Sequence, residues 1–140
     1  MKIALDQQAI MLAEATGNLG AALVEILDET GTNLILVARK AQKLRDSFPD
    51  LVNSPTTYLS NATDLTDPDQ VKATVMEAIH KLGKIDGLVN AAGAYREGRT
   101  IGKTDPETLE MLLSINLRTA FLTSRAVIPG MRAQGSGSIV

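Results

Sequence analysis

The chain has 140 residues, of which 44% are hydrophobic and 21% are charged, with a net charge of −2 and no cysteine. This composition is too apolar for a disordered chain, and no apolar run approaches the roughly 20 residues of a membrane span. The small net charge offers nucleic acid or an anionic membrane no electrostatic surface, and the lack of cysteine excludes disulfides and thiolate chemistry. We expect one cytoplasmic domain over residues 1–140, with no nucleic-acid or membrane partner.

Five short apolar runs predict β-strands, at residues 9–12, 33–38, 57–59, 85–90 and 136–140. Helical patterns separate several of these runs, which is typical of a parallel sheet with crossover helices. The first crossover has four apolar residues on one face, Leu19, Leu23, Ile26 and Leu27, and Gly31 is placed to end it. The predicted fold class is therefore α/β.

Two further helices begin with an acid followed by proline. Asp67 is a candidate N-cap before Pro68, and Gln70 completes a capping-box pattern, while Gly83 ends this helix. The second helix spans residues 105–131 and is apolar over a wide surface. It either buries a second face against a partner subunit, which would make the protein a homo-oligomer, or lies deep in its own domain. We expect the preceding loop, residues 94–103, to be mobile and solvent-exposed.

Four stretches together resemble the short-chain dehydrogenase/reductase family. They are L-I-L-V-A-R-K at 34–40, A-T-D-L-T-D at 62–67, G-L-V-N-A-A-G at 87–93 and S-I-N-L-R-T-A-F at 114–121. Each is weak alone, but their order and spacing fit the family over essentially the whole chain. The resemblance implies a Rossmann-like doubly wound parallel sheet of about five strands, order 3-2-1-4-5. Such a sheet binds a nicotinamide dinucleotide beyond the carboxyl ends of its strands.

The resemblance assigns the adenosine end of that site. Arg39, with Lys40 behind it, matches the position where a basic side chain pairs with the 2′-phosphate of NADP, whereas NAD-preferring members have an acid there. The resemblance therefore favours NADP, the alternative being a solvated pair of charges. Asp64 matches the aspartate that accepts from the adenine amino group, and Leu65 lines the ring.

Two further segments gain roles in the same way. The residues that match the turn passing close to the adenosine ribose are Asn90, Ala91, Ala92 and Gly93. A structural role, in which Asn90 just holds neighbouring strands together, is compatible with this cofactor role. Asn116 matches the catalytic asparagine that holds a water in the proton relay, although an asparagine bridging a helix kink would look the same. No pattern resembles a metal site, and the only histidine, His80, is expected to be solvated.

The glycine-rich motif of the family is altered in this chain. Counting back from Arg39 places T-G-x-x-x-G-x-G on residues 13–20, where only Gly20 is in register and Glu14 stands at the first glycine. Thr16, Leu19 and Gly20 remain as candidate cofactor-binding residues. A carboxylate about 4 Å from a phosphate costs on the order of 4 kcal/mol at an effective dielectric near 20, so we expect weak or lost dinucleotide binding.

Two interpretations of this turn are open. In the first, Glu14 places its carboxylate at the N-terminus of the following helix, in place of phosphate. In the second, residues 16–20 form a shifted phosphate-binding turn, with Asn18 in a left-handed conformation.

The family's catalytic serine and Tyr-x-x-x-Lys pair do not occur in the 140 residues. Tyr58 and Tyr95 are followed at the fourth place by Ala62 and Arg99. By resemblance, this is the N-terminal part of an NAD(P)-dependent oxidoreductase that transfers hydride to or from a carbonyl or alcohol substrate, and it should be inactive alone. The alternative is a non-catalytic binding or interaction module. A serine and a Tyr-x-x-x-Lys in the coding sequence after Val140 would favour the enzyme.

Overall fold

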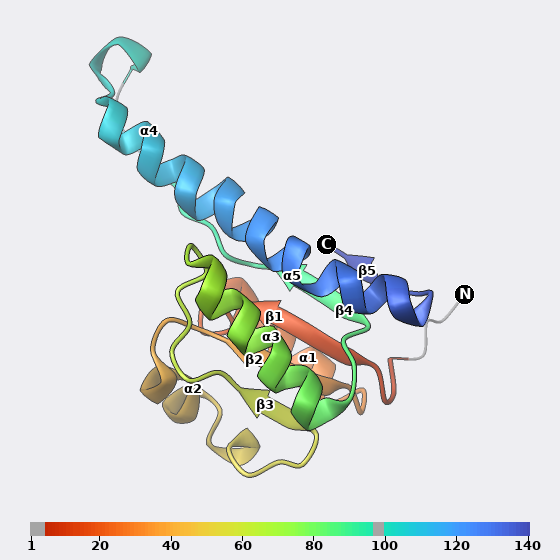
Figure 1. Cartoon of the computed structure of the whole chain (residues 1–140). Helices are drawn as coiled ribbons and strands as arrows, with labels where there is room; N and C mark the ends of the chain where they lie inside the picture. Colours follow the sequence, from red (N-terminus) through yellow and green to blue (C-terminus); the bar gives the residue numbers. More distant parts are fainter. Residues whose placement is uncertain (1–4, 97–99) are drawn as a thin grey trace.

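The computed structural model describes residues 5–96 and 100–140. Its five strands are β1 (Ala9–Ala13), β2 (Asn33–Val37), β3 (Thr57–Leu59), β4 (Gly87–Asn90) and β5 (Ser138–Ile139). All neighbouring strands pair in parallel, in the order β3-β2-β1-β4-β5 (Figure 1). The predicted α/β class and strand order 3-2-1-4-5 are confirmed, and strand boundaries differ from the predictions by at most two residues.

The helices cover both faces of the sheet. They are α1 (Asn18–Asp28), α2 (Ala41–Ser47), α3 (Pro68–Leu82), α4 (Pro106–Leu113) and α5 (Thr119–Gln134), with shorter 3₁₀ turns at Pro49–Leu51 and Ile101–Lys103. α1 and α2 pack over one face, where Leu12, Leu34 and Leu44 are buried. α3 and α5 pack over the other face, where Met11, Val75 and Val127 are buried. The arrangement is therefore doubly wound.

The start of α3 follows the predicted cap with one difference. The Asp67 carboxylate accepts from the backbone N–H groups of Asp69 and Gln70, and Pro68 is the first helical residue. The Gln70 side chain does not close a capping box on the Asp67 backbone. Instead it accepts from the backbone N–H of Asp64 at 2.9 Å, which joins the β3–α3 loop to the helix.

The long helix predicted over residues 105–131 is present but is not regular. Its middle, Ser114–Arg118, is a π-helical segment between α4 and α5. α4 projects beyond the sheet and buries none of its residues, whereas α5 lies against α3 and β4 (Figure 1). The interpretation that the whole helix lies deep in its own domain is wrong, because α4 extends past the edge of the sheet and has no buried residue (Figure 1).

Other parts of the chain were predicted less completely. Helix α2 was not predicted, since it contributes only one buried residue, Leu44, and so has little apolar periodicity. In the loop over residues 94–103, the described residues are exposed, and Glu97, Gly98 and Arg99 lie outside the described residues.

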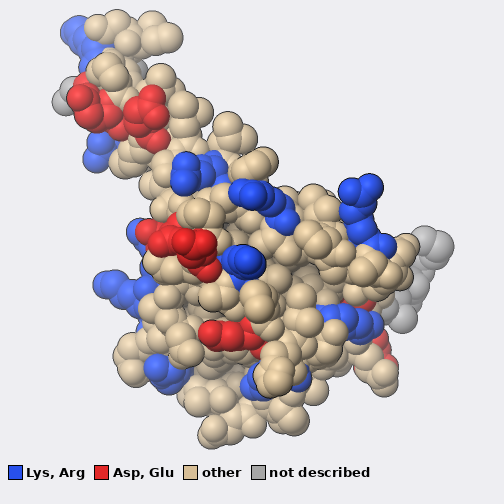
Figure 2. Space-filling model, in the orientation of Figure 1, with Lys and Arg blue, Asp and Glu red and all other residues tan. Residues whose placement is uncertain are grey.

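Two surface properties agree with the composition. Among the described residues, no helix is long and apolar enough to cross a membrane. On the face drawn in Figure 2, Lys and Arg side chains lie between Asp and Glu side chains, with no large patch of one sign. His80 is exposed, as expected.

Candidate functional site

The carboxyl ends of three strands meet at one edge of the sheet. Ala13, the last residue of β1, lies opposite Val37 of β2 and Asn90 of β4. The segments that follow these strands therefore lie side by side, which brings Glu14, Arg39 and Gly93 to one place. In open α/β sheets this edge is where ligands bind.

Glu14 forms the sharp turn that leads from β1 towards α1. Its φ is +67°, in the left-handed region that residues other than glycine rarely adopt. Its backbone carbonyl accepts from Gly17 N–H at 3.1 Å. A Cβ on Gly20 would lie 2.4 Å from that same carbonyl oxygen, so Gly20 allows α1 to pack against the turn. The turn thus holds a glutamate in a conformation that glycine adopts more readily.

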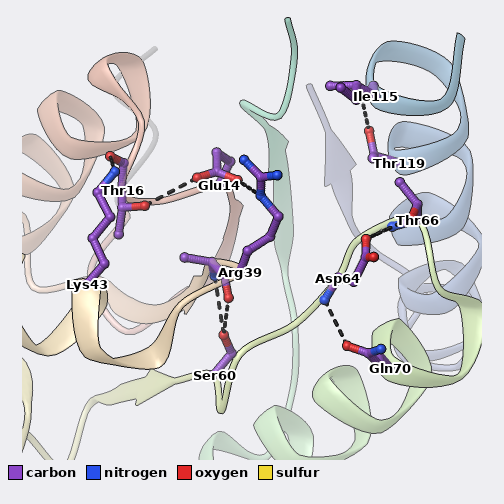
Figure 3. A network of polar contacts seen from close by, with 11 residues as sticks. Glu14, Thr16, Arg39, Lys43, Ser60, Asp64, Thr66, Gln70, Ile115 and Thr119 are labelled. Carbon is purple, nitrogen blue, oxygen red and sulfur yellow. Dashed lines mark hydrogen bonds and ion pairs between the residues drawn. The ribbon is translucent and has the colours of Figure 1, made fainter. Parts of the chain in front are cut away.

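The Glu14 side chain points towards Arg39 and Thr16. Its Oε1 accepts from Thr16 Oγ1 at 3.2 Å, and its Oε2 lies 4.0 Å from Arg39 Nε (Figure 3). The N-cap of α1 is Gly17, and no side chain of the described residues caps this helix. The interpretation that the Glu14 carboxylate occupies the helix N-terminus is therefore wrong, because the left-handed turn directs it towards Arg39.

The alternative of a shifted turn is also contradicted. Asn18 is the first residue of α1 and is not among the residues with positive φ; the left-handed residue is Glu14. The first-turn N–H groups of α1 lie at the same edge of the sheet, and a helix N-terminus is a favourable place for an anion.

A cavity of about 380 Å³ lies at the strand ends. Its lining comes from these three segments, the β3–α3 loop, the π-helical segment and the start of α5: Glu14, Arg39, Asp64, Leu65, Thr66, Ala92, Gly93, Ala94, Ile115 and Thr119. Four of the predicted cofactor-binding residues, Arg39, Asp64, Leu65 and Gly93, are brought together here. The other five, Thr16, Leu19, Gly20, Asn90 and Ala91, lie outside this lining.

Asp64 is held in place by its own loop. Its Oδ1 accepts from the backbone N–H of Thr66 at 2.9 Å and from Thr66 Oγ1 at 2.7 Å. Its Oδ2 has no hydrogen bond to the part of the chain that the structure describes, so this oxygen is free to accept from a ligand. Leu65 beside it is buried in the core and also lines the cavity.

Lys43 is a residue of this region that the sequence reasoning missed. From α2 it donates through Nζ to the backbone carbonyl of Thr16 at 3.1 Å, which places a second cation beside the β1–α1 turn (Figure 3). Lys43 lies in the first turn of α2, three residues after the N-cap residue Lys40. Its position could therefore be predicted only once helix α2 was predicted.

Asn116 connects the π-helical segment to the end of the β4 loop. Its Oδ1 accepts from Ala94 N–H at 3.1 Å, and its Nδ2 donates to the carbonyls of Ala94 and Leu112, both at 2.9 Å. The bond to Leu112 lies where the helix widens. π-helical turns are common at functional sites. The structure thus places Asn116 as the bridge across a helix irregularity, next to the cavity.

Asn90 links the sheet to α5. Its Oδ1 accepts from the fully buried Thr123 hydroxyl at 2.6 Å, and its backbone N–H donates to Val140 beyond β5. Asn90 was expected to hold neighbouring strands together. Its backbone does so, through β1 and the segment after β5, whereas its side chain bonds to α5.

Among the described residues, two groups have a clearly shifted pKa, and neither group lines the cavity. Hydrogen bonds from Gln70 and Asp69 to the cap carboxylate lower the pKa of Asp67. Burial, together with a hydrogen bond to Glu77 at 2.6 Å, raises the pKa of Tyr58. Asp67 caps α3, and Tyr58 joins β3 to α3 through Glu77. No cluster of His, Cys, Asp or Glu that could hold a metal ion occurs among the described residues.

A second, larger hollow of about 830 Å³ lies along α4 and α5. Apolar residues spaced four apart form its exposed side: Leu113 at 44%, Leu117 at 64% and Phe121 at 60% exposure. Spacing of four places these side chains on one helix face. No described element of the chain covers this face.

The chain is similar to proteins of one family. The family model described as short chain dehydrogenase matches residues 8–140. An uncharacterized oxidoreductase of Staphylococcus saprophyticus is 29% identical over 136 residues, 97% of this chain and 54% of its own length. The 3-oxoacyl-[acyl-carrier-protein] reductase FabG of Thermotoga maritima is 26% identical, over 97% of this chain and 55% of its own.

The fold is similar to solved structures of the same kind. A metagenomic short-chain oxidoreductase, solved in complex with NADP, is 30% identical with a TM-score of 0.85, covering 98% of this chain and 62% of that one. The chain thus spans about half the length of the curated relatives it matches.

Proposed function

Because the chain belongs to the short chain dehydrogenase family, we propose that its sheet edge binds the adenosine half of a nicotinamide dinucleotide. The observation that supports this most is the cavity that joins Arg39, Asp64, Leu65 and Gly93. These four residues come from three separate motifs of the sequence, and in the folded chain all four line one cavity. A family relative of similar fold was solved in complex with NADP.

The cavity suits an adenosine group in its chemistry. Leu65 and Ile115 offer apolar surface to a ring, and Asp64 Oδ2 is free to accept from an exocyclic amino group. A Cβ on Gly93 would lie 3.0 Å from Asn116 Oδ1, so glycine keeps this wall open. The α1 N-terminus, without a side-chain cap, is the complementary place for a diphosphate.

Taken alone, Arg39 would favour NADP over NAD. Its side chain is 74% exposed, so the guanidinium can reach a 2′-phosphate, and Lys43 adds a cation on the same side of the turn. A planar guanidinium matches the oxygens of phosphate. Glu14 opposes both cations, and we therefore propose weak binding.

For the whole protein, we propose hydride transfer between the nicotinamide and a small carbonyl or alcohol substrate. Bound dinucleotide supplies the hydride chemistry. Asn116, with both of its polar groups bonded, would hold the segment beside the reacting end, and the relay role inferred from the family would have to use the same atoms. The 140 residues contain no Tyr-x-x-x-Lys, so we propose that they bind dinucleotide without turning over substrate.

The alternative is a non-catalytic interaction module, and one observation favours association. The exposed stripe of Leu113, Leu117 and Phe121 on the projecting helix lies outside the contacts of its own domain. A stripe that is the same on two copies can pair about a two-fold axis. We propose a homodimer through this helix, which is compatible with either function.

Titration of the purified chain with NADPH and NADH, read by the fluorescence of the reduced nicotinamide, tests the binding proposal. We expect weak, saturable binding that Asp64→Ala weakens further, while His80→Ala, an exposed control on α3, leaves it unchanged. Absence of saturable binding of either dinucleotide at millimolar concentration would overturn the proposal and favour the module.

A further inference from the structure

We infer that Glu14 competes with the 2′-phosphate for Arg39, so that its carboxylate cancels the preference for NADP that Arg39 would otherwise give. This inference rests on the proposed function. It concerns which dinucleotide the site selects, and it assigns selection to a residue of the β1–α1 turn and not only to the end of β2.

The first support is the position of the carboxylate. Glu14 Oε2 lies 4.0 Å from Arg39 Nε, and both side chains line the same cavity. A phosphate bound to the Arg39 guanidinium would therefore stand close to a carboxylate as well. Arg39 would attract the anion and Glu14 would repel it, and at similar distances the two effects largely cancel.

The second support is the difference in freedom between the two partners. The Glu14 side chain is only 25% exposed, and its other oxygen accepts from Thr16, whereas the Arg39 side chain is 74% exposed. When an anion arrives, Arg39 can turn towards it, but Glu14 is held by its turn. The carboxylate would thus stay beside Arg39 whether or not a dinucleotide is bound.

The third support is the backbone. A left-handed conformation is strained for a residue with a Cβ, and glycine would avoid this strain. Strain that persists at a ligand-binding edge points to a role for the side chain that causes it. The contacts with Thr16 and Arg39 are the ones that this side chain makes at the edge.

The test compares NADPH with NADH on wild type, Glu14→Gln and a control. Glutamine keeps the length and the turn and removes only the charge, and Glu25→Gln removes an equivalent charge from the exposed face of α1. We expect wild type to bind the two dinucleotides with similar affinity. Glu14→Gln should tighten NADPH roughly tenfold and leave NADH within about twofold, as expected for removing one charge pair near the surface. Glu25→Gln should change neither.

A double variant completes the test. If Glu14 acts through Arg39, the gain for NADPH should disappear in Glu14→Gln/Arg39→Gln. Equal tightening of both dinucleotides by Glu14→Gln would overturn the inference, because it would place the repulsion at the shared diphosphate, and an unchanged ratio would overturn it as well. Both outcomes require binding and so leave the proposed function intact. Failure of every variant to bind either dinucleotide would overturn both.

Discussion

Asn116 bonds to both backbone polar groups of Ala94, accepting from its N–H at 3.1 Å and donating to its carbonyl at 2.9 Å. The pair fastens the segment after β4 to the π-helical turn. These hydrogen bonds also position one wall of the 380 Å³ cavity, because Ala94 and its neighbour Gly93 line that cavity.

Removing this bridge should loosen the segment. We expect Asn116→Ala to lower the free energy of unfolding by about 1 kcal/mol, since its hydrogen bonds are made at an exposed position. Asn116→Asp keeps the acceptor for the Ala94 N–H but loses the hydrogen bonds donated to Ala94 and Leu112. Its free energy of unfolding should therefore lie between those of wild type and Asn116→Ala. Urea denaturation followed by circular dichroism measures this, and an unfolding midpoint of Asn116→Ala equal to that of wild type would contradict the bridging role.

Gly20 tests the packing of α1 on the turn. Alanine there would place Cβ 2.4 Å from Glu14 O and 2.9 Å from Ala15 C, both backbone atoms that cannot move independently. We expect Gly20→Ala to destabilise the fold by about 1–3 kcal/mol, the usual range for overpacking. At Gly17 the nearest atom would be 3.4 Å away, so Gly17→Ala serves as the mild control. Equal thermal midpoints of the two variants would show that the close approach is absent.

The β1–α1 turn and its neighbours show how much of the site the sequence predicts. The sheet order was predicted from the apolar runs and the resemblance, and it is confirmed. Gly20 lets α1 pack against the β1–α1 turn, and its role in cofactor binding stays a prediction. The direction of the Glu14 side chain could not be predicted, because it depends on a left-handed turn that a glutamate rarely adopts. Lys43 was missed since α2 is short, and the π-helical turn has no sequence signal distinct from an α-helix.

The cap of α3 predicts a pH dependence. Hydrogen bonds from Gln70 and Asp69 lower the pKa of Asp67 below its ordinary value of 3.8 in the folded protein. Such a carboxylate stabilises the fold above that ordinary value, and the stabilisation is lost as the pH falls through the lowered pKa. Urea midpoints should favour wild type over Asp67→Ala at neutral pH, and the difference should shrink as the pH falls below about 4. A difference that is constant with pH would contradict this.

The exposed helix stripe predicts a dimer. Leu117→Asp should shift the chain from dimer to monomer in light scattering coupled to size-exclusion chromatography, because it puts a charge at the centre of the proposed contact. Ile26→Asp, which changes an equally exposed apolar residue on α1, should leave the dimer intact. A wild-type chain that is monomeric at the highest concentration tested would refute the homodimer.

The central claim is that a dinucleotide places its adenosine half among Arg39, Asp64 and Gly93. The most direct measurement is a titration of ¹⁵N-labelled chain with NADPH, followed by two-dimensional NMR. The account predicts saturable shifts of the backbone amides of these three residues, with α3 residues such as His80 unaffected. Saturable shifts confined to another surface, or none at these amides, would contradict it.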